Sequence, residues 1–277
     1  MKRSAAAIVW LLCAVLIAVP VALAGTLELQ FIDVGQGDAI LLQTSEAAVL
    51  VDAGEQEQAA DYLEKRGIAR IDLAIATHAH ADHIGGFPAV FDTIQVNELW
   101  YNGQEHTTLT FEHFVDTLLE SGAQYHEPIA GETRSFGELT VEVLHPQRSA
   151  ADYTGDLHDQ VIVLRARYGE FSVLLTSDAE ADLERGLLDR YSALEATVLK
   201  LGHHGSNTSS SAEFLAAVSP AIVVYQAGPD NPYGHPHSEA IDRVRTITEA
   251  EVFGTDRHGT IVITTDGHDY TVRTTPR

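Results

Sequence analysis

The stretch THAHADHIGG, residues 77–86, places three histidines and an aspartate within six consecutive positions. His78 and His80 are two residues apart, so at the end of an extended strand their side chains point the same way. Asp82 and His83 follow where the chain is expected to turn into a helix. Neutral imidazoles and a carboxylate are ligands for zinc, and also for manganese or iron. A solvated polar loop is the alternative, but four convergent N and O ligands favour a metal site.

One loop cannot complete the coordination of a metal, so further ligands must come from elsewhere in the chain. Asp178 ends the expected strand FSVLLTSD and is either a ligand or the N-cap of the next helix, a position that Ser177 could also fill. His203 and His204, in LKLGHHGSN, follow another strand, and the sequence does not separate their roles. His158, in the loop DLHDQ, is the third candidate.

Other polar residues have two interpretations each. His235, in NPYGHPH, either contacts a substrate or fixes a turn between two prolines. Asp33 and Asp38, in FIDVGQGDA, either form a turn or support metal ligands from behind. Lys200 faces either the site or solvent. The remaining histidines lack convergent spacing and are assigned to the surface, among them His106, His113, His126, His258 and His268.

Alternating strands and helices are expected to position these groups. Strands are expected at residues 26–35, 38–45, 47–54, 71–77, 94–102, 139–146, 160–169, 170–178, 196–202, 221–228, 252–255, 259–265 and 270–275. Helices are expected at residues 56–67, 84–93, 109–122, 179–191, 211–220 and 237–250. With no linker or fixed repeat, the pattern predicts one α/β domain over residues 25–277, with helices outside its sheets.

Residues 1–24 are set apart by a basic start, an apolar stretch and a small-residue ending at Ala22-Leu23-Ala24. This pattern predicts a secretory signal peptide cleaved before Gly25, or otherwise an uncleaved membrane anchor. Either predicts a protein that is secreted or held at the outer face of the membrane. The single cysteine, Cys13, lies in this segment, so the rest of the chain has no thiolate ligand or nucleophile.

The chain of 277 residues carries a net charge of −23. Such acidity disfavours nonspecific binding to nucleic acid or to an anionic membrane, so a polyanionic substrate would need a local cationic site. Contact with a membrane is expected only through an uncleaved N-terminal segment, and the sequence does not indicate an oligomeric state.

Several motifs in order resemble one family. THAHADHIGG matches the HxHxDH pattern of the metallo-β-lactamase superfamily. FIDVGQGDAILLQ, VDAG, LLTSDAE, LKLGHHGSNTSS and NPYGHP resemble the extracellular hydrolase domain of ComEC-type DNA-uptake proteins and their stand-alone relatives. The resemblance extends from about Phe31 to Ile263. It implies a four-layer αββα sandwich with a dinuclear metal site at one edge.

The resemblance also implies ligands for the first metal. His78 and His80 match its first two imidazoles, and His158 restores a third where many ComEC-type domains have asparagine. Two positions depart from the family pattern without removing a ligand. Ser177 stands where glycine is more usual, and Gln226 where serine is common.

For the second metal, the resemblance implies Asp82 and His83, with Asp178 bridging the two ions. His203 is expected to complete this second set, although it is not cleanly separated from His204. The expected cofactors are therefore two divalent ions, zinc first, with manganese or iron as alternatives.

Two such ions, about 3.5–4 Å apart, lower the pKa of a bridging water to about 7, so hydroxide is the expected nucleophile. This predicts a metal-dependent hydrolase, with a phosphodiesterase or nuclease first. Asp82, His204 and His235 are the residues expected to act in catalysis, the two histidines as contacts to phosphate or leaving-group oxygen. The alternatives are a hydrolase of small esters, phosphorylcholine compounds or lactones, and a non-catalytic accessory protein of DNA uptake.

Overall fold

The computed structural model describes residues 25–153 and 155–276. The expected signal peptide or anchor, residues 1–24, lies outside these described residues. Within them, no helix has both the length and the apolar character needed to cross a membrane.

The first sheet contains the strands that begin the chain and those that end it. Its eight strands lie in the order β17 (Tyr270–Thr275), β16 (Thr260–Thr265), β1 (Leu27–Phe31), β2 (Ile40–Gln43), β3 (Ala48–Val51), β5 (Leu73–Ala76), β7 (Glu98–Tyr101) and β8 (Gln124–His126). Every residue of β2, β3 and β5 is buried. Both faces of this sheet are therefore covered, as the continuous apolar runs of these strands require.

The second sheet is built from the middle of the chain. Its seven strands lie in the order β15 (Glu251–Gly254), β14 (Ile222–Tyr225), β13 (Val198–Lys200), β12 (Phe171–Leu175), β11 (Val163–Tyr168), β10 (Leu139–His145) and β9 (Thr133–Phe136). Two short strands, β4 (Arg70–Ile71) and β6 (Gln95–Val96), pair separately. The sequence did not indicate β8 and β9, which are short, largely exposed and without an apolar pattern.

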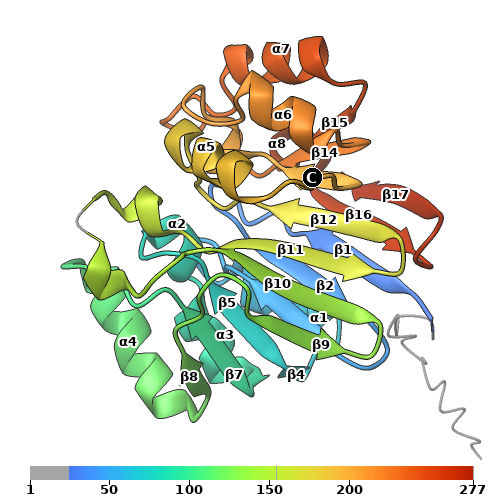
Figure 1. Cartoon of the computed structure of the whole chain (residues 1–277). Helices are drawn as coiled ribbons and strands as arrows, with labels where there is room; N and C mark the ends of the chain where they lie inside the picture. The colour runs from blue at the N-terminus through green and yellow to red at the C-terminus, as the bar shows by residue number, and fades with distance from the viewer. Residues whose placement is uncertain (1–24, 154, 277) are drawn as a thin grey trace, which may run out of the picture.

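Helices cover the outer face of each sheet (Figure 1). They are α1 (Gln58–Lys65), α2 (Ala81–Ile84), α3 (Phe87–Thr93), α4 (Leu109–Ser121), α5 (Ala181–Arg190), α6 (Ala212–Val218), α7 (Ser238–Ile247) and α8 (Thr255–His258). Short 3₁₀ turns lie at η1 (Ala150–Asp152), η2 (Leu157–Gln160) and η3 (Gly202–Gly205).

Three apolar clusters hold these layers together. One fills the space between the sheets and joins residues such as Phe31 and Leu164. A second packs α1, α3 and α4 on the first sheet, and a third packs α5, α6 and α7 on the second. The expected αββα sandwich is confirmed, with burial of apolar surface as its main source of stability.

The strand directions bring the polar segments to one edge. Strands β3 and β5 are parallel, and so are β12, β13 and β14. Because the carboxyl ends of parallel strands share an edge, the segments that follow these strands can meet there.

The helix expected at residues 84–93 begins only at Phe87, as α3, and Gly85 and Gly86 separate it from the short helix α2 before it. A Cβ on Gly86 would lie 2.1 Å from the carbonyl oxygen of Ala53. Glycine is therefore required by the close approach of the loop after β3, which positions α2 against it.

Candidate metal centre

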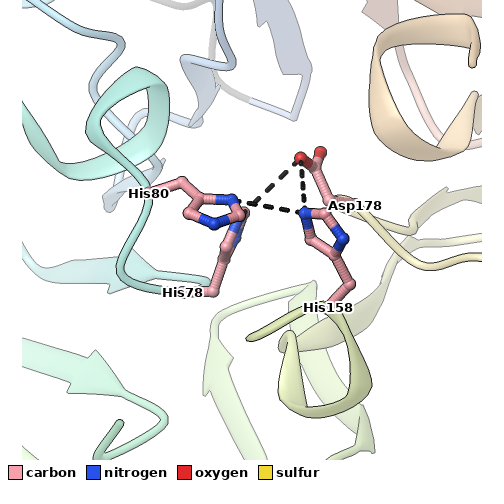
Figure 2. Close-up of side chains that lie close together, drawn as sticks. All are labelled: His78, His80, His158 and Asp178. Carbon is pink, nitrogen blue, oxygen red and sulfur yellow. Dashed lines mark hydrogen bonds and ion pairs between the residues drawn. The ribbon is translucent and has the colours of Figure 1, made fainter. Parts of the chain in front are cut away.

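Polar side chains from both sheets form a first group at this edge. Figure 2 shows His78 and His80 on one side, with His158 and Asp178 opposite. One ligand atom from each of the four lies within 4.8 Å of the others. His80 Nδ1 is 3.0 Å from His78 Nε2 and 3.3 Å from His158 Nε2. Asp178 Oδ2 is 3.7 Å from His78 Nε2 and 3.9 Å from His158 Nε2.

Hydroxyl groups orient the first group from behind. Nδ1 of His78 faces Thr77 Oγ1 at 3.2 Å and Ser177 Oγ at 3.4 Å. The Ser177 hydroxyl donates to Thr77 Oγ1 (2.7 Å), and Thr77 donates in turn to Asp52 Oδ2 (2.8 Å). These hydrogen bonds hold the His78 ring by its Nδ1 side, so its Nε2 faces the other ligands of the first group. Ser177 has a φ of 48°, in the left-handed region that glycine adopts more easily.

A second group lies on the other side of Asp178. Asp178 Oδ1 is 3.3 Å from His83 Nε2 and 3.5 Å from His204 Nε2. Asp82 Oδ2 approaches His204 Nε2 at 3.1 Å. Asp38 also belongs to this cluster by distance, but it lies against Nδ1 of His204, the ring nitrogen opposite the one that faces Asp178. The atoms directed at a common point therefore come from Asp82, His83, Asp178 and His204.

Buried acceptors orient both histidines of the second group. His83 Nδ1 is 2.8 Å from Asp52 Oδ2. His204 Nδ1 is 3.0 Å from the carbonyl oxygen of Gln226 and 3.2 Å from Asp38 Oδ1. An acceptor at Nδ1 favours a proton there, so Nε2 is the nitrogen that each ring offers to a cation.

The donor set fits a divalent cation. His83 Nε2, His204 Nε2 and Asp178 Oδ1 are buried and have no hydrogen-bond partner among the described residues. Leaving a buried polar atom unsatisfied costs about 1–3 kcal/mol, yet three such atoms converge here. A cation bound between them would satisfy all three, and imidazole with carboxylate suits zinc, manganese or iron.

The titration behaviour of the two groups differs. Burial lowers the pKa of His78 well below its ordinary value and the pKa of His80 to about 4, so both are neutral at neutral pH. Burial alone would lower the pKa of His83 and His204 as well. The carboxylate of Asp178 opposes it, with Asp52 at His83 and Asp38 at His204, and both pKa values rise well above the ordinary range.

The adjacent histidines His203 and His204 require a correction. The sequence placed His203 in the second group, but His204 occupies that position and is 1% exposed. His203 is half-buried, with Nε2 3.8 Å from Asp178 Oδ2 and Nδ1 3.2 Å from Glu180 Oε1. Both residues have left-handed backbones, with φ of 47° and 55°, in the turn η3. This turn sends His204 inward and leaves His203 at the mouth.

A cleft of about 420 Å³ opens above both groups. His235 lines it, with its ring 5.4 Å from that of His203 and 6.0 Å from that of His204. His106 lines it too, 6.2 Å from the ring of His80, so its assignment to the surface by spacing is corrected. The loop after β7 brings it there, a placement that local spacing does not reveal.

Several supporting residues were missed or left open by the sequence. Asp52, in VDAG, was given no role of its own from the sequence, although a carboxylate at the end of β3, the strand beside β5, is a usable signal. Glu180, which contacts His203, gave no signal. Asp178 does not cap α5, whose N-cap is Glu180. Lys200 is fully buried rather than facing solvent.

The comparisons with known proteins agree with this architecture. The family model described as the metallo-beta-lactamase superfamily matches residues 32–228. The chain is 28% identical over 255 residues to ComE operon protein 3 of Bacillus subtilis (strain 168), covering 84% of this chain and 32% of that protein. It is 34% identical over 219 residues to competence protein ComA of Neisseria gonorrhoeae, covering 77% and 29%. The chain thus spans about a third of the length of these relatives.

A solved structure supports the fold alone. The metallo-beta-lactamase fold protein YhfI from Bacillus subtilis superposes with a TM-score of 0.56 at 14% identity, covering 86% of this chain and 99% of that one. With the family match over most of the described residues and the His/Asp groups at the sheet edge, the chain belongs to the metallo-β-lactamase superfamily and has ComEC-type relatives.

Proposed function

We propose that this protein is a dinuclear metal hydrolase that cleaves phosphodiesters. The observation that carries the proposal is the position of Asp178, whose Oδ2 faces the first group and whose Oδ1 faces the second. One carboxylate between two sets of nitrogen donors is the arrangement that a pair of cations requires. The proposed ligands are His78, His80 and His158 for one cation, Asp82, His83 and His204 for the other, and Asp178 for both.

Zinc is the proposed cation, because imidazole nitrogens outnumber carboxylates over the two sets together, five histidines to two aspartates. When bound, two such cations supply Lewis-acid chemistry and lower the pKa of water at the site. His83, Asp178 and His204 are at most 1% exposed, so the charges of the second group interact more strongly than they would in water.

His203 and His235 are proposed to contact the substrate. His203 Nδ1 lies against Glu180, so its Nε2 faces the cleft beside Asp178. Burial lowers the pKa of His235 to about 4, so its ring is neutral and carries a single N–H. Its buried Nδ1 has no partner among the described residues. His235 can donate its N–H to a phosphoryl or leaving-group oxygen, whereas Glu180 holds the ring proton of His203 at Nδ1, so His203 Nε2 accepts a hydrogen bond from a substrate hydroxyl or from water. The substrate role expected for His204 thus passes to His203.

DNA is the first candidate substrate, because one of the relatives is named a competence protein. One observation favours the alternative, a hydrolase of small uncharged esters. The described residues that line the cleft include no lysine or arginine, and the chain carries a net charge of −23. Binding a long polyanion depends on basic contacts to its phosphates, which this cleft lacks.

The test is a substrate panel with the zinc-loaded protein. Single-stranded DNA, double-stranded DNA, bis(p-nitrophenyl) phosphate, p-nitrophenyl acetate and a lactone would be compared, with His80→Ala as the inactive control. Turnover of the phosphodiesters that His80→Ala abolishes supports the proposal. Turnover of the carboxylic esters alone supports the alternative. Equal rates for both proteins on every compound would contradict any hydrolase and favour an accessory role.

We also propose that the protein acts outside the cytoplasm, secreted or at the outer face of the membrane. The support is the basic and apolar composition of residues 1–24, with its small-residue ending. Fractionation of expressing cells with an antibody to the hydrolase domain tests this. Recovery in the cytoplasm alone would refute it.

A further inference from the structure

Lys200 is a fully buried lysine beside the second group. It ends β13, and its side chain is 0% exposed. Its Nζ forms an ion pair with Asp38 Oδ2 and donates to the carbonyl oxygen of Ser177 at 3.0 Å. Lysine is rarely buried, because removing its charge from water costs several kcal/mol unless the ammonium is paired. The position therefore has a specific role for a positive charge.

Asp38 connects this charge to the second group. Its side chain is 1% exposed, with Oδ2 on Lys200 and Oδ1 3.2 Å from His204 Nδ1. Its backbone N–H also donates to the carbonyl oxygen of Asp82 at 3.1 Å. A single residue thus contacts two proposed ligands, one through its side chain and one through its backbone.

The turn before Asp38 is shaped for this contact. Gly37 has a φ of 115°, and a Cβ there would lie 2.1 Å from the carbonyl oxygen of Asp82. Only glycine allows the turn to approach the Asp82 backbone so closely. The sequence GQGD in FIDVGQGDA is therefore explained by its packing against the second group.

The two histidines of the second group are supported differently. Asp52, behind His83, accepts hydrogen bonds from the backbone N–H and the hydroxyl of Thr77. Asp38, behind His204, is instead neutralised by Lys200. The same ammonium holds the carbonyl of Ser177, the residue before the shared ligand Asp178. Lys200 thereby joins the turn at Asp38 to the ends of β12 and β13.

We propose that Lys200 and Asp38 form a positioning pair for the second cation. The pair holds His204 with Nδ1 toward Asp38 and Gln226, so that Nε2 is directed at the cation position before the cation binds. Lys200 keeps the Asp38 carboxylate in place in a buried site. This inference rests on the proposed function, because it assumes that the second group binds a cation.

The test measures the affinity of each cation in the purified full chain by zinc titration against a competing chelator. The variants are Lys200→Met and Asp38→Asn, and Lys65→Met is the matched control, since Lys65 is an exposed lysine on α1. We expect both variants to weaken the second zinc about 10–100-fold, the usual effect of losing a supporting partner of a ligand. The first zinc and the control should match the wild type.

The double variant Lys200→Met/Asp38→Asn separates positioning from charge balance. It removes both buried charges, so the free energy of unfolding in EDTA should recover relative to Lys200→Met, while the second zinc stays weak. Recovery of both quantities would overturn the proposal, as would equal weakening of both zinc ions in the single variants. If Lys200→Met does not fold, the affinities of the two zinc ions in Asp38→Asn and in the double variant test the proposal, again by whether the second zinc alone is weakened.

The number of zinc ions bound by the wild type distinguishes failure of the positioning pair from failure of the proposed dinuclear function. Two zinc ions in the wild type and two with unchanged affinity in the variants would refute the positioning pair alone. One zinc ion at saturation in the wild type would refute the dinuclear function and the pair together.

Discussion

Substitution of the adjacent histidines His203 and His204 should give opposite results. His204 Nε2 is one of four atoms directed at the second cation position, through Asp178 and Asp82. Zinc binding by four protein ligands is worth about 10–16 kcal/mol, so one ligand contributes roughly 3 kcal/mol. His204→Ala should therefore weaken the second zinc by about two orders of magnitude. His203→Ala should leave both zinc ions in place and reduce kcat/KM about 10-fold, the loss of one hydrogen bond to substrate.

The assay is zinc content by mass spectrometry after dialysis against a chelator of intermediate affinity, followed by kinetics on bis(p-nitrophenyl) phosphate. Thermal unfolding in EDTA controls for the fold: metal-free His203→Ala should lose no more than about 2 kcal/mol, whereas metal-free His204→Ala, which removes a buried partner of Asp178 and Asp38, should lose about 3–5 kcal/mol. Loss of a zinc from His203→Ala with retention in His204→Ala would refute the geometric reasoning.

Three further outcomes are expected. The raised pKa values of His83 and His204 mean that the second cation displaces protons, so its affinity should fall between pH 8 and pH 6. Calorimetry in two buffers would show proton release when the second cation binds, and its absence would contradict this. His235→Ala should lower kcat/KM about 10-fold on phosphodiesters without changing zinc content, as steady-state kinetics would show. When free zinc is present at 100 times the Kd of a site, removing the zinc from that site should lower the free energy of unfolding by about 2.7 kcal/mol. An unchanged Tm after zinc removal would contradict this.

Much of the architecture could be predicted because its signals are local. The apolar runs and glycine stops predicted most strands and helices, and the order of motifs indicated the fold and family, both of which are confirmed. The spacing of His78 and His80 placed them at the end of a strand, where β5 ends. Asp178 was indicated in the same way by its place after β12.

The positions of the misassigned residues are set by the local direction of the backbone and by segments far away in the sequence. His203 and His204 differ only in which way a left-handed turn sends each side chain, and residue type carries no such information. The residues around Lys200 do not show whether its side chain is buried. Its partner Asp38 lies 162 positions earlier, and only the fold brings the two side chains together. His106 reaches the cleft on the loop between β7 and α4, and the spacing of nearby residues does not reveal where that loop lies.

The most direct test of the proposed dinuclear centre is zinc stoichiometry at saturation, compared between the wild type and Asp178→Asn. Asp178 contacts both groups, through Oδ2 and Oδ1. The proposed function predicts two zinc ions per wild-type chain and a loss of affinity at both positions when this carboxylate is neutralised. A single zinc in the wild type, or weakening at only one position in Asp178→Asn, would contradict it.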